Sequence, residues 1–445
     1  MLHHHSRRPL IGLAFAAALG LTGLTACSSG SQSGASSSAD CSAYESYGDL
    51  SGSSVSIYSP YTGADQERLE NSWADFSTCT GVEIVYEGSS DFESQVQVRI
   101  QGGNLPDILF VAQPGLLTSL ADEDLLVPAT DTVQQNVETG WSDGFRTYGS
   151  VDGTLYASPL TTGLKSFVWY SPKAFAEKGY EVPTTWQELL DLTDTISKTG
   201  DRVWCEGFES GAATGWPGTD WLEDLVIRSA GADVYDQWIS HEIPFNDPQI
   251  VNALDEVGKI LKNDAYVNAG FGDVSSIAST NQLDALYAIG DGSCYLSHRN
   301  GSATWDEEYD VAPDGDVWGF AMPVMDEGDT QTLVGGGEFV AALSDDPAVT
   351  AVREYFSSAT FANDMVKQGL VSANQGVDPA NATSEQLENV ITILQDKDAE
   401  FRFDASDLMP TAVGSGTFWT GMVDWILGAD SQDVLDQIEA SWPEN

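Results

Sequence analysis

The sequence is poor in basic residues. Its 18 lysines and arginines stand against 68 aspartates and glutamates, which gives a formal net charge of −50 at pH 7. A surface of this charge repels nucleic acid and anionic substrates, so we expect no nucleic-acid partner and a neutral ligand. The acidity equally fits an adaptation to habitat or to solubility, and for that reason it does not identify the ligand.

Motifs of common enzymes and metal sites are absent. The sequence has no CxxC or Cys/His spacing typical of zinc, no Gly-rich phosphate loop and no nucleophile elbow. Asp310, Asp314 and Asp316 do not have the spacing of a calcium loop. We therefore expect no metal and no cofactor.

Long hydrophobic runs are also scarce. The run from Pro9 to Leu24 is too short and too rich in alanine for a membrane span, and it follows Arg7 and Arg8 as in a secretory signal peptide. Residues 24–27, Leu-Thr-Ala-Cys, resemble the lipobox of bacterial lipoproteins, so 1–27 would be the signal peptide and Cys27 the lipidated residue. A Ser/Gly tether over 28–41 follows. We expect a protein held by lipid on the extracellular face of the cell membrane.

Cysteine is used sparingly. Apart from Cys27, the chain has Cys41, Cys79, Cys205 and Cys294. This even set predicts two disulfides in an oxidising compartment. Four cysteines allow three pairings, and the sequence alone does not choose among them.

Strand and helix patterns alternate after the tether. Strands are predicted over 55–58, 82–86 and 108–111, with helices over 64–78 and 92–101 between them. This order predicts an α/β fold with a parallel sheet, which binds ligands beyond the carboxyl ends of its strands. The loops at those ends carry polar candidates for ligand binding: Asp65, Gln66, Ser90, Asp91 and Gln113. The alternative for Asp65 and Asp91 is that each caps the helix that follows it.

A cluster of aromatic and polar residues is the strongest local signal. Residues 216–221, Trp-Pro-Gly-Thr-Asp-Trp, precede an amphipathic run over 223–229 that predicts a helix. Indole rings suit the apolar face of a sugar, and hydroxyls and carboxylates bind its hydroxyl groups. We therefore predict a sugar site with Trp216, Thr219, Asp220 and Trp221. The alternative is that one indole belongs to the core and that Thr219 or Asp220 merely caps the helix.

Several segments together resemble a known family. They are GNLPDI, AQPG, LYASPLTTGLKSFVWYS, PTTWQEL and GWPGTDWLEDL. In this order they resemble extracellular solute-binding proteins of ATP-binding-cassette importers. The segments GWPGTDW, YDQWISHEIPF and FRFDASDLMPTAVGSGTFW are similar to the α-glucoside-binding branch, which is related to maltose-binding proteins.

The resemblance implies a fold of the periplasmic-binding-protein type II. Two α/β domains would be joined by crossing hinge segments, with a ligand cleft between them. Domain 1 would comprise 42–158 and 322–378, and domain 2 would comprise 159–321 and 379–445. We favour disulfides between Cys41 and Cys79 and between Cys205 and Cys294, because each pair then lies within one domain.

The resemblance also implies further binding residues. Trp419, after a Gly/Ser loop, matches a stacking position of the family. Thr162, Trp318, Gly336, Gly337, Glu338 and Arg402 lie in other matching segments. Two alternatives remain: Gly336 and Gly337 mark a bulge in a strand, and Arg402 pairs with Asp404, two residues away on the same face of a strand.

The function implied by the resemblance is capture of an α-glucoside such as maltose, sucrose or trehalose. A monomeric binding protein, without enzymatic activity, would close on the carbohydrate and deliver it to the permease subunits. One alternative is a secreted glycoside hydrolase, which needs two carboxylates beside the scissile bond. Another is an adhesive or scaffold lipoprotein that binds no sugar, because a fold does not determine a function.

Overall fold

The computed structural model of the protein describes residues 40–267, 271–306 and 308–443. The predicted signal peptide, the predicted lipidation site at Cys27 and nearly all of the predicted tether lie outside these residues. Within the described ranges, no helix combines the length and the apolar character that crossing a bilayer requires.

The first sheet follows from the strand and helix repeats in the N-terminal part of the chain. β1 (Ser54–Ser59) pairs in parallel with β2 (Glu83–Gly88) on one side and with β3 (Ile108–Val111) on the other. β12 (Phe339–Ala342) and β6 (Ala157–Pro159) extend the sheet as antiparallel strands, in the order β2-β1-β3-β12-β6. The predicted parallel strands are confirmed, and the chain returns to this sheet far downstream through β12.

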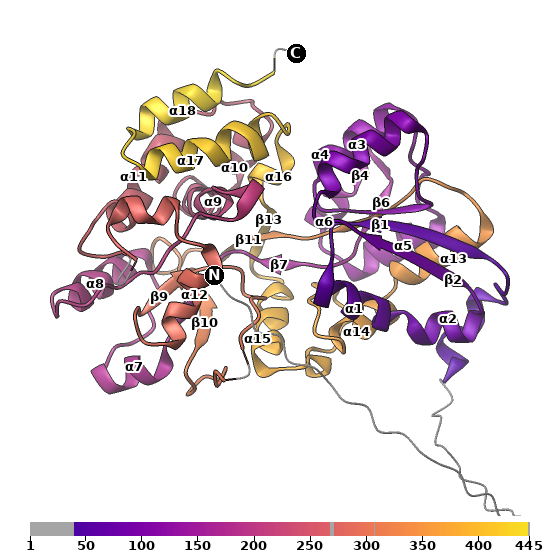
Figure 1. Cartoon of the computed structure of the whole chain (residues 1–445), viewed down its shortest axis with the longest axis horizontal. Helices are drawn as coiled ribbons and strands as arrows, with labels where there is room; N and C mark the ends of the chain where they lie inside the picture. Colours follow the sequence, from indigo (N-terminus) through magenta and orange to yellow (C-terminus); the bar gives the residue numbers. More distant parts are fainter. Residues whose placement is uncertain (1–39, 268–270, 307, 444–445) are drawn as a thin grey trace, which may run out of the picture. The chain divides into compact units, whose positions relative to one another are not determined.

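Helices cover both faces of this sheet, because successive side chains of a strand point to opposite faces. Leu109 and Val111 belong to one apolar cluster with α3 and α4, whereas Ile108 and Phe110 pack with α1, α2, α13 and α14 (Figure 1). These helices are α1 (Gly63–Ser72), α2 (Ala74–Thr80), α3 (Phe92–Gly102), α4 (Pro114–Asp122), α13 (Pro347–Phe356) and α14 (Ala359–Val366).

The single helix predicted over 64–78 is in fact two helices. Trp73 separates α1 from α2 with φ −107° and ψ 7°, which is outside helical geometry. It is nevertheless buried with Leu69 and Phe76 in the core. The apolar spacing stays helical across a break of one residue, so the pattern does not reveal the break.

Two further sheets lie in the rest of the chain. One has the order β10-β8-β9 and is antiparallel; the other has the order β13-β11-β7. Their strands are β7 (Gly163–Leu164), β8 (Phe167–Tyr170), β9 (Leu296–His298), β10 (Trp318–Ala321), β11 (Thr332–Gly336) and β13 (Glu400–Phe403). In the second of these sheets β11 joins two segments that are distant in sequence, because it pairs with β13 on one side and with β7 on the other.

A second large core forms around α9. This helix is buried on all sides from Pro217 to Arg228, and it packs against α10, α11 and α17. Its helices are α9 (Trp216–Ala230), α10 (Ala232–Ile239), α11 (Pro248–Leu261), α17 (Trp419–Ile426) and α18 (Ser431–Glu439). The remaining α-helices and strands are α5 (Asp131–Gly140), α6 (Asp143–Tyr148), β4 (Ser150–Val151), β5 (Thr154–Leu155), α7 (Pro172–Lys178), α8 (Trp186–Ser197), α12 (Gln282–Gly290), α15 (Glu385–Leu394) and α16 (Ala405–Leu408).

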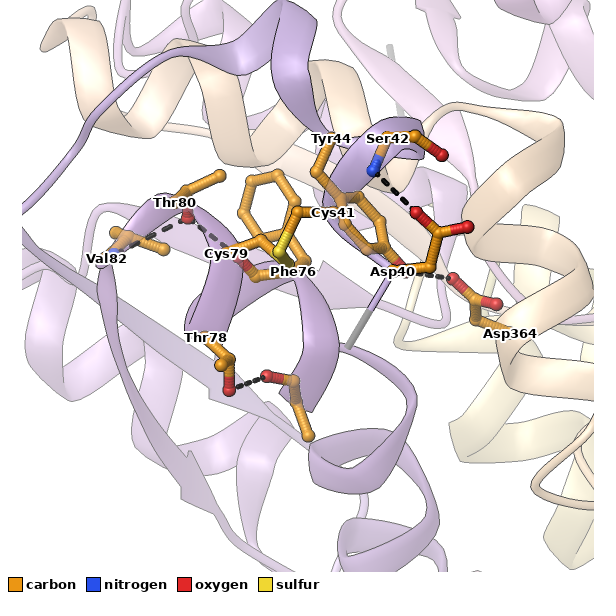
Figure 2. The surroundings of a disulfide bond; sticks show 11 residues. Asp40, Cys41, Ser42, Tyr44, Phe76, Thr78, Cys79, Thr80, Val82 and Asp364 are labelled. Carbon is orange, nitrogen blue, oxygen red and sulfur yellow. Dashed lines mark hydrogen bonds between the residues drawn. A yellow bond between two sulfur atoms is a disulfide. The ribbon is translucent and has the colours of Figure 1, made fainter. Parts of the chain in front are cut away.

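Both favoured disulfides are present. Cys41 bonds to Cys79 with a Cα–Cα distance of 5.4 Å, and Cys205 bonds to Cys294 with a Cα–Cα distance of 5.8 Å. Figure 2 shows the first of them, which joins the turn at the start of the described chain to α2. Beside it, the Tyr44 hydroxyl donates a hydrogen bond of 3.1 Å to Asp364. This N-terminal turn is therefore attached both covalently and by packing.

Candidate functional site

A cavity of about 430 Å³ opens where the parallel strands β1 and β3 end. Tyr61 and Asp65 follow β1 and line it, and Ala112 does so after β3. Its other walls come from the connection between β6 and β8, the connection between β11 and β12, and the starts of α9 and α12. The position agrees with the rule that open α/β sheets bind ligands at the carboxyl ends of their strands.

Trp216 reaches this cavity because α9 begins there. Gly215 is the N-cap residue with φ 113°, a conformation that favours glycine, and a Cβ at Gly215 would collide with the carbonyl oxygen of Trp419. The helix therefore starts seven residues earlier than predicted, and neither Thr219 nor Asp220 is its cap. Trp216 is half-buried and lines the cavity. Trp221 lies fully in the core, edge to face with Trp204 at 5.2 Å.

Lys165 sits beside Trp216 among buried carboxylates. Its Nζ donates to Asp220 Oδ1 at 3.2 Å and also to Asp404, and it lies 5.4 Å from the centre of the Trp216 ring. Asp220, Asp404 and Glu223 offer oxygens within 4.8 Å of one another, a spacing that would also suit a metal ion. The cation among the described residues that meets Asp220 and Asp404 is the Lys165 ammonium. Lys165 and Asp407 line the cavity, so this charged network forms part of its wall.

The charges of this network are set by burial and by Lys165. Burial lowers the pKa of Lys165, but Asp220, Asp404 and Asp407 together raise that pKa well above its ordinary value. Burial would raise the pKa of Asp404 as well, yet Lys165 holds it below its ordinary value. Asp407 differs, because burial and then the neighbouring Asp404 charge raise its pKa well above the ordinary value. The Asp407 carboxyl therefore holds its proton more tightly than an ordinary aspartate, and in the protonated form it can donate a hydrogen bond to a ligand.

Glu338 forms a second polar wall. Its carboxylate accepts hydrogen bonds from the hydroxyls of Tyr61 and Thr161, which lie 2.9 Å from each other. Burial raises the pKa of Glu338, although both of these hydrogen bonds oppose the rise. At the adjoining Gly337 a Cβ would collide with the Thr161 carbonyl, so close approach of two backbones explains the glycine.

Arg299 and Asn300 complete the wall after β9. The Arg299 guanidinium donates to the carbonyl oxygens of Gly207 at 2.7 Å and His298 at 2.8 Å, and to the Glu206 carboxylate at 3.4 Å. The Arg299 side chain is only 3% exposed. Its hydrogen-bonding capacity is thus largely used within the protein. Besides the paired cations Lys165 and Arg68, the cavity offers a ligand hydroxyl, amide and carboxyl groups and one indole.

Comparison with known proteins agrees with this geometry. Residues 62–366 match the family described as bacterial extracellular solute-binding proteins. The chain belongs to this family. Two relatives are 36% identical to this solute-binding protein. One is the osmoprotective compounds-binding protein GgtB of Synechocystis sp., aligned over 89% of this chain and 94% of its own. The other is the alpha-glucosides-binding periplasmic protein AglE of Rhizobium meliloti, aligned over 88% of each chain.

Solved structures support the same fold. A bacterial solute receptor described as preferring galactopyranose superposes with a TM-score of 0.72 at 17% identity, covering 87% of this chain and 98% of its own. A maltose-bound protein of T. maritima has a TM-score of 0.65, also at 17% identity, with the same coverage of both chains. The predicted type II binding-protein fold and the resemblance to sugar-importer binding proteins are confirmed.

Family membership decides between the classes of function considered above. Solute-binding proteins are not enzymes, so the glycoside hydrolase is set aside. The family implies a sugar ligand, an ABC permease as partner and a location outside the cell membrane, which also sets aside a scaffold without a ligand.

The structure brings six of the predicted binding residues of this solute-binding protein into the cavity wall. They are Asp65, Thr162, Trp216, Gly336, Gly337 and Glu338. Asp65 does not cap α1, whose N-cap residue is Thr62. Asp220 lies behind the wall and contacts the cavity-lining Lys165.

The other predicted residues do not line this cavity. Gln66 donates to Glu70 at 2.8 Å, and Asp91 and Gln113 are the N-cap residues of α3 and α4. Ser90 lies in the loop before α3, Thr219 donates to the Trp216 carbonyl, and Trp318 pairs with Tyr170 between β10 and β8. Trp221 is in the core, Trp419 contacts Gly215 through its backbone, and Arg402 pairs with Asp236 at 2.8 Å and with Glu400 at 3.2 Å. Arg402 therefore does not pair with Asp404, whose partner is Lys165.

Sequence reasoning missed several residues of the cavity wall. The main ones are Lys165, Asp407, Tyr61 and Asn300. One signal was available for Lys165: it is a cation within an apolar strand segment of a chain that has few cations. Burial of such a residue requires a charged partner, which points to a functional network.

The Asp220 carboxyl makes stability depend on pH. Burial raises its pKa from 3.8 to about 6, against the opposing effect of Lys165. The folded protein therefore binds the proton more tightly than the unfolded chain, and this stabilisation is lost as pH rises through about 6. We expect Asp220→Asn to flatten the fall in the free energy of unfolding between about pH 4 and 6. Urea unfolding followed by circular dichroism measures this, and parallel pH profiles for the two proteins would contradict it.

Proposed function

We propose that this protein captures α-glucosides of the maltose, sucrose or trehalose type in the cavity beside Trp216 and delivers them to an ABC permease. The observation that carries the proposal is the combination of one indole with a continuous polar wall. Trp216 offers a surface for a pyranose ring, and Lys165, Asp407 and Glu338 offer hydrogen-bonding groups around it. The name of the Rhizobium meliloti relative, at 36% identity, supports this class of ligand.

The electrostatics of the cavity favour a neutral ligand. Each cation that lines the cavity already has an anionic partner: Lys165 is paired with Asp220 and Asp404, Arg299 with Glu206, and Arg68 with Asp65 at 3.2 Å. The cavity therefore has no unpaired cation, among the residues described, to hold a phosphate or a carboxylate. A sugar hydroxyl both donates and accepts hydrogen bonds. The Tyr61 hydroxyl, the Asn300 amide and the Asp407 carboxyl present both kinds of partner in the cavity wall.

Capture would proceed by closure of two domains around the sugar. We assign 42–158 with 322–378 to domain 1 and 159–321 with 379–445 to domain 2. This division is supported by the cavity, since Tyr61 and Glu338 come from the first set of segments and Trp216, Asn300 and Asp407 from the second. We further propose that the mature chain is a monomer anchored through lipid on Cys27.

A second candidate ligand is a small glucosylated osmolyte. It is favoured by the Synechocystis relative, whose name gives osmoprotective compounds and whose identity to this chain is also 36%. Such a molecule shares a glucosyl ring with the first class but lacks the second sugar ring. A disaccharide therefore needs contacts in the cavity for a second ring besides the one on Trp216, whereas a glucosylated osmolyte does not.

Calorimetric titration of the chain that follows Cys27 tests both candidates. The panel is maltose, sucrose, trehalose, maltotriose, glucose and a glucosylated polyol. Heat with a disaccharide and little with glucose supports the α-glucoside proposal, whereas heat with the glucosylated polyol alone favours the second candidate. No heat with any member, from protein shown to be folded, refutes both.

Two tryptophans of α9 provide a matched pair of variants. Trp216→Ala removes a half-buried ring at the cavity, so we expect about tenfold weaker binding, or about 1.4 kcal/mol, with little change in stability. Trp221→Ala empties a core position and should lower the free energy of unfolding by about 3–5 kcal/mol. Titration and urea unfolding of both variants measure the contrast. Unchanged affinity in Trp216→Ala would remove this residue from the site.

A further inference from the structure

A second cavity lies beside α6 and β13. Its volume is also about 430 Å³, and none of its lining residues lines the first cavity. Its walls come from Trp141 and the start of α6, from Ala373 and Gln375, from the end of α15, and from residues 396–397 and 399–402. α6 packs against β13, where the Phe403 amide donates to the Tyr148 hydroxyl at 3.2 Å. The packing of α6 against β13 therefore fixes the two walls of the cavity relative to each other.

Three aromatic rings line this second cavity. Trp141 and Phe145 are 5.0 Å apart between ring centres, and Phe145 stacks on Phe401 at 4.5 Å with an angle of 21° between the rings. Trp141 and Phe145 are buried, whereas Phe401 is half-buried. The cavity therefore contains a packed aromatic surface, and Phe401 is its most exposed ring. An exposed ring of this kind is available to stack on the apolar face of a ligand.

The rim of the cavity is polar and balanced in charge. Lys397 and Arg402 stand with Asp396 and Glu400, two cations with two anions, in a chain where acidic residues outnumber basic ones by 68 to 18. The amide of Gln375, exposed at the rim, adds both a donor and an acceptor. This mixture favours a neutral molecule with several hydroxyl groups over an anion or a cation.

We propose that this cavity is a second binding site, for a small neutral glycoside, and that its occupancy is coupled to the first cavity. Two chain segments link the cavities. Residues 369–371 line the first cavity, and Ala373 and Gln375 of the same segment line the second. Residues 400–402 line the second cavity, and Asp407 a few residues later lines the first.

The coupling passes through a defined contact. Asp404 lies between residues 400–402, which line the second cavity, and Asp407, which lines the first. Its carboxylate binds Lys165 in the wall of the first cavity. A ligand that shifts β13 also shifts this carboxylate. Because binding linkage is reciprocal, a ligand in either cavity changes the affinity of the other by the same factor, and we expect about fivefold.

The test uses the chain that follows Cys27, labelled with 5-fluorotryptophan and observed by fluorine NMR. Trp141→Phe and Trp216→Phe assign the resonances that report the second and the first cavity. The labelled protein is titrated with maltose, trehalose, sucrose and methyl α-D-glucopyranoside up to about 50 mM, which covers millimolar dissociation constants. We expect the Trp141 resonance to shift saturably with a midpoint different from that of Trp216.

A variant that fills the second cavity separates direct binding from a remote effect. Ala399→Phe should abolish the Trp141 shift and leave the Trp216 shift in place, which also shows that the variant is folded. If that variant does not fold, Gln375→Ala at the exposed rim should move the Trp141 midpoint at least about threefold. The proposal is overturned if Trp141 does not respond to any of the four sugars, or if its shift follows that of Trp216 and survives the substitution. A silent Trp216 with a responsive Trp141 would instead refute the α-glucoside proposal for the first cavity.

Discussion

Replacing Lys165 with methionine is expected to lower the free energy of unfolding by about 3–5 kcal/mol, because removal of one partner leaves buried carboxylates without their counter-ion. The same substitution should weaken sugar binding by about tenfold or more, since a charged hydrogen-bonding group is lost from the cavity wall. Urea unfolding and calorimetric titration measure the two effects on the same preparation.

The loss of stability in Lys165→Met should also depend on pH. Lys165 holds the pKa of Asp404 below its ordinary value, and without it burial raises that pKa. A carboxyl with a raised pKa stabilises the folded state when protonated, and this contribution disappears as pH rises. The variant should therefore be closest to the wild type near pH 5 and furthest from it near pH 8.

Two controls make this result specific. The double variant Lys165→Met with Asp404→Asn removes one charge of each sign and should recover part of the stability that Lys165→Met alone loses. Lys173→Met breaks the exposed pair with Asp316 and should change stability little. If Lys165→Met and Lys173→Met lower the free energy of unfolding equally, burial of the Lys165 network does not add to stability.

The second large effect concerns the disulfides, which should differ in what their loss does to binding. Cys205→Ala with Cys294→Ala, and separately Cys41→Ala with Cys79→Ala, remove cross-links that close loops of 89 and 38 residues. From loop entropy, each should cost about 4–5 kcal/mol of stability. We expect only the first variant to bind sugar less well.

The two disulfides should differ in their effect on binding because only the Cys205–Cys294 bond lies next to segments of the cavity wall. Cys205 immediately precedes Glu206, the partner of Arg299, and Cys294 lies between α12 and β9, which lead to Gln282, Arg299 and Asn300 in the cavity wall. Cys41 and Cys79 lie in the N-terminal turn and α2, and neither lines the cavity. Titration of both variants at a temperature where each is folded measures the difference. Equal affinities would show that the wall does not depend on the Cys205–Cys294 bond.

The parts of the fold that are encoded locally were predictable from the sequence. The strands β1, β2 and β3 follow from their apolar runs, and the Thr-x-x-Glu spacing of Thr185 and Glu188 is the capping box that opens α8. The paired role of Trp216 and Trp221 was not predictable in this way. The sequence pattern places residues 216–221 before the helix, whereas they form the first turns of α9. Because the two tryptophans are five residues apart on this helix, one indole points to the cavity and the other to the core.

Contacts distant in sequence account for most of the site that was missed. Lys165 meets Asp220 and Asp404, which are 55 and 239 residues away, and Glu338 meets Tyr61 across 277 residues. No local periodicity encodes such meetings. The contact between Lys165 and Asp404, for example, forms because β11 pairs with β7 on one side and with β13 on the other. Glycines mark some of these places: Gly337 is required by the approach of another backbone, which the sequence alone does not distinguish from a bulge.

The Cys41–Cys79 bond also has a mechanical consequence. With the proposed anchor at Cys27, a pull on the anchored end would act first on the residues at the start of the described chain. These are two short turns, Cys41–Ala43 and Glu45–Tyr47, which without a cross-link would peel away from Phe76 and Tyr355 one contact at a time. Because the bond joins Cys41 to α2, the force enters at Cys79 instead, and the turns behind it carry no load.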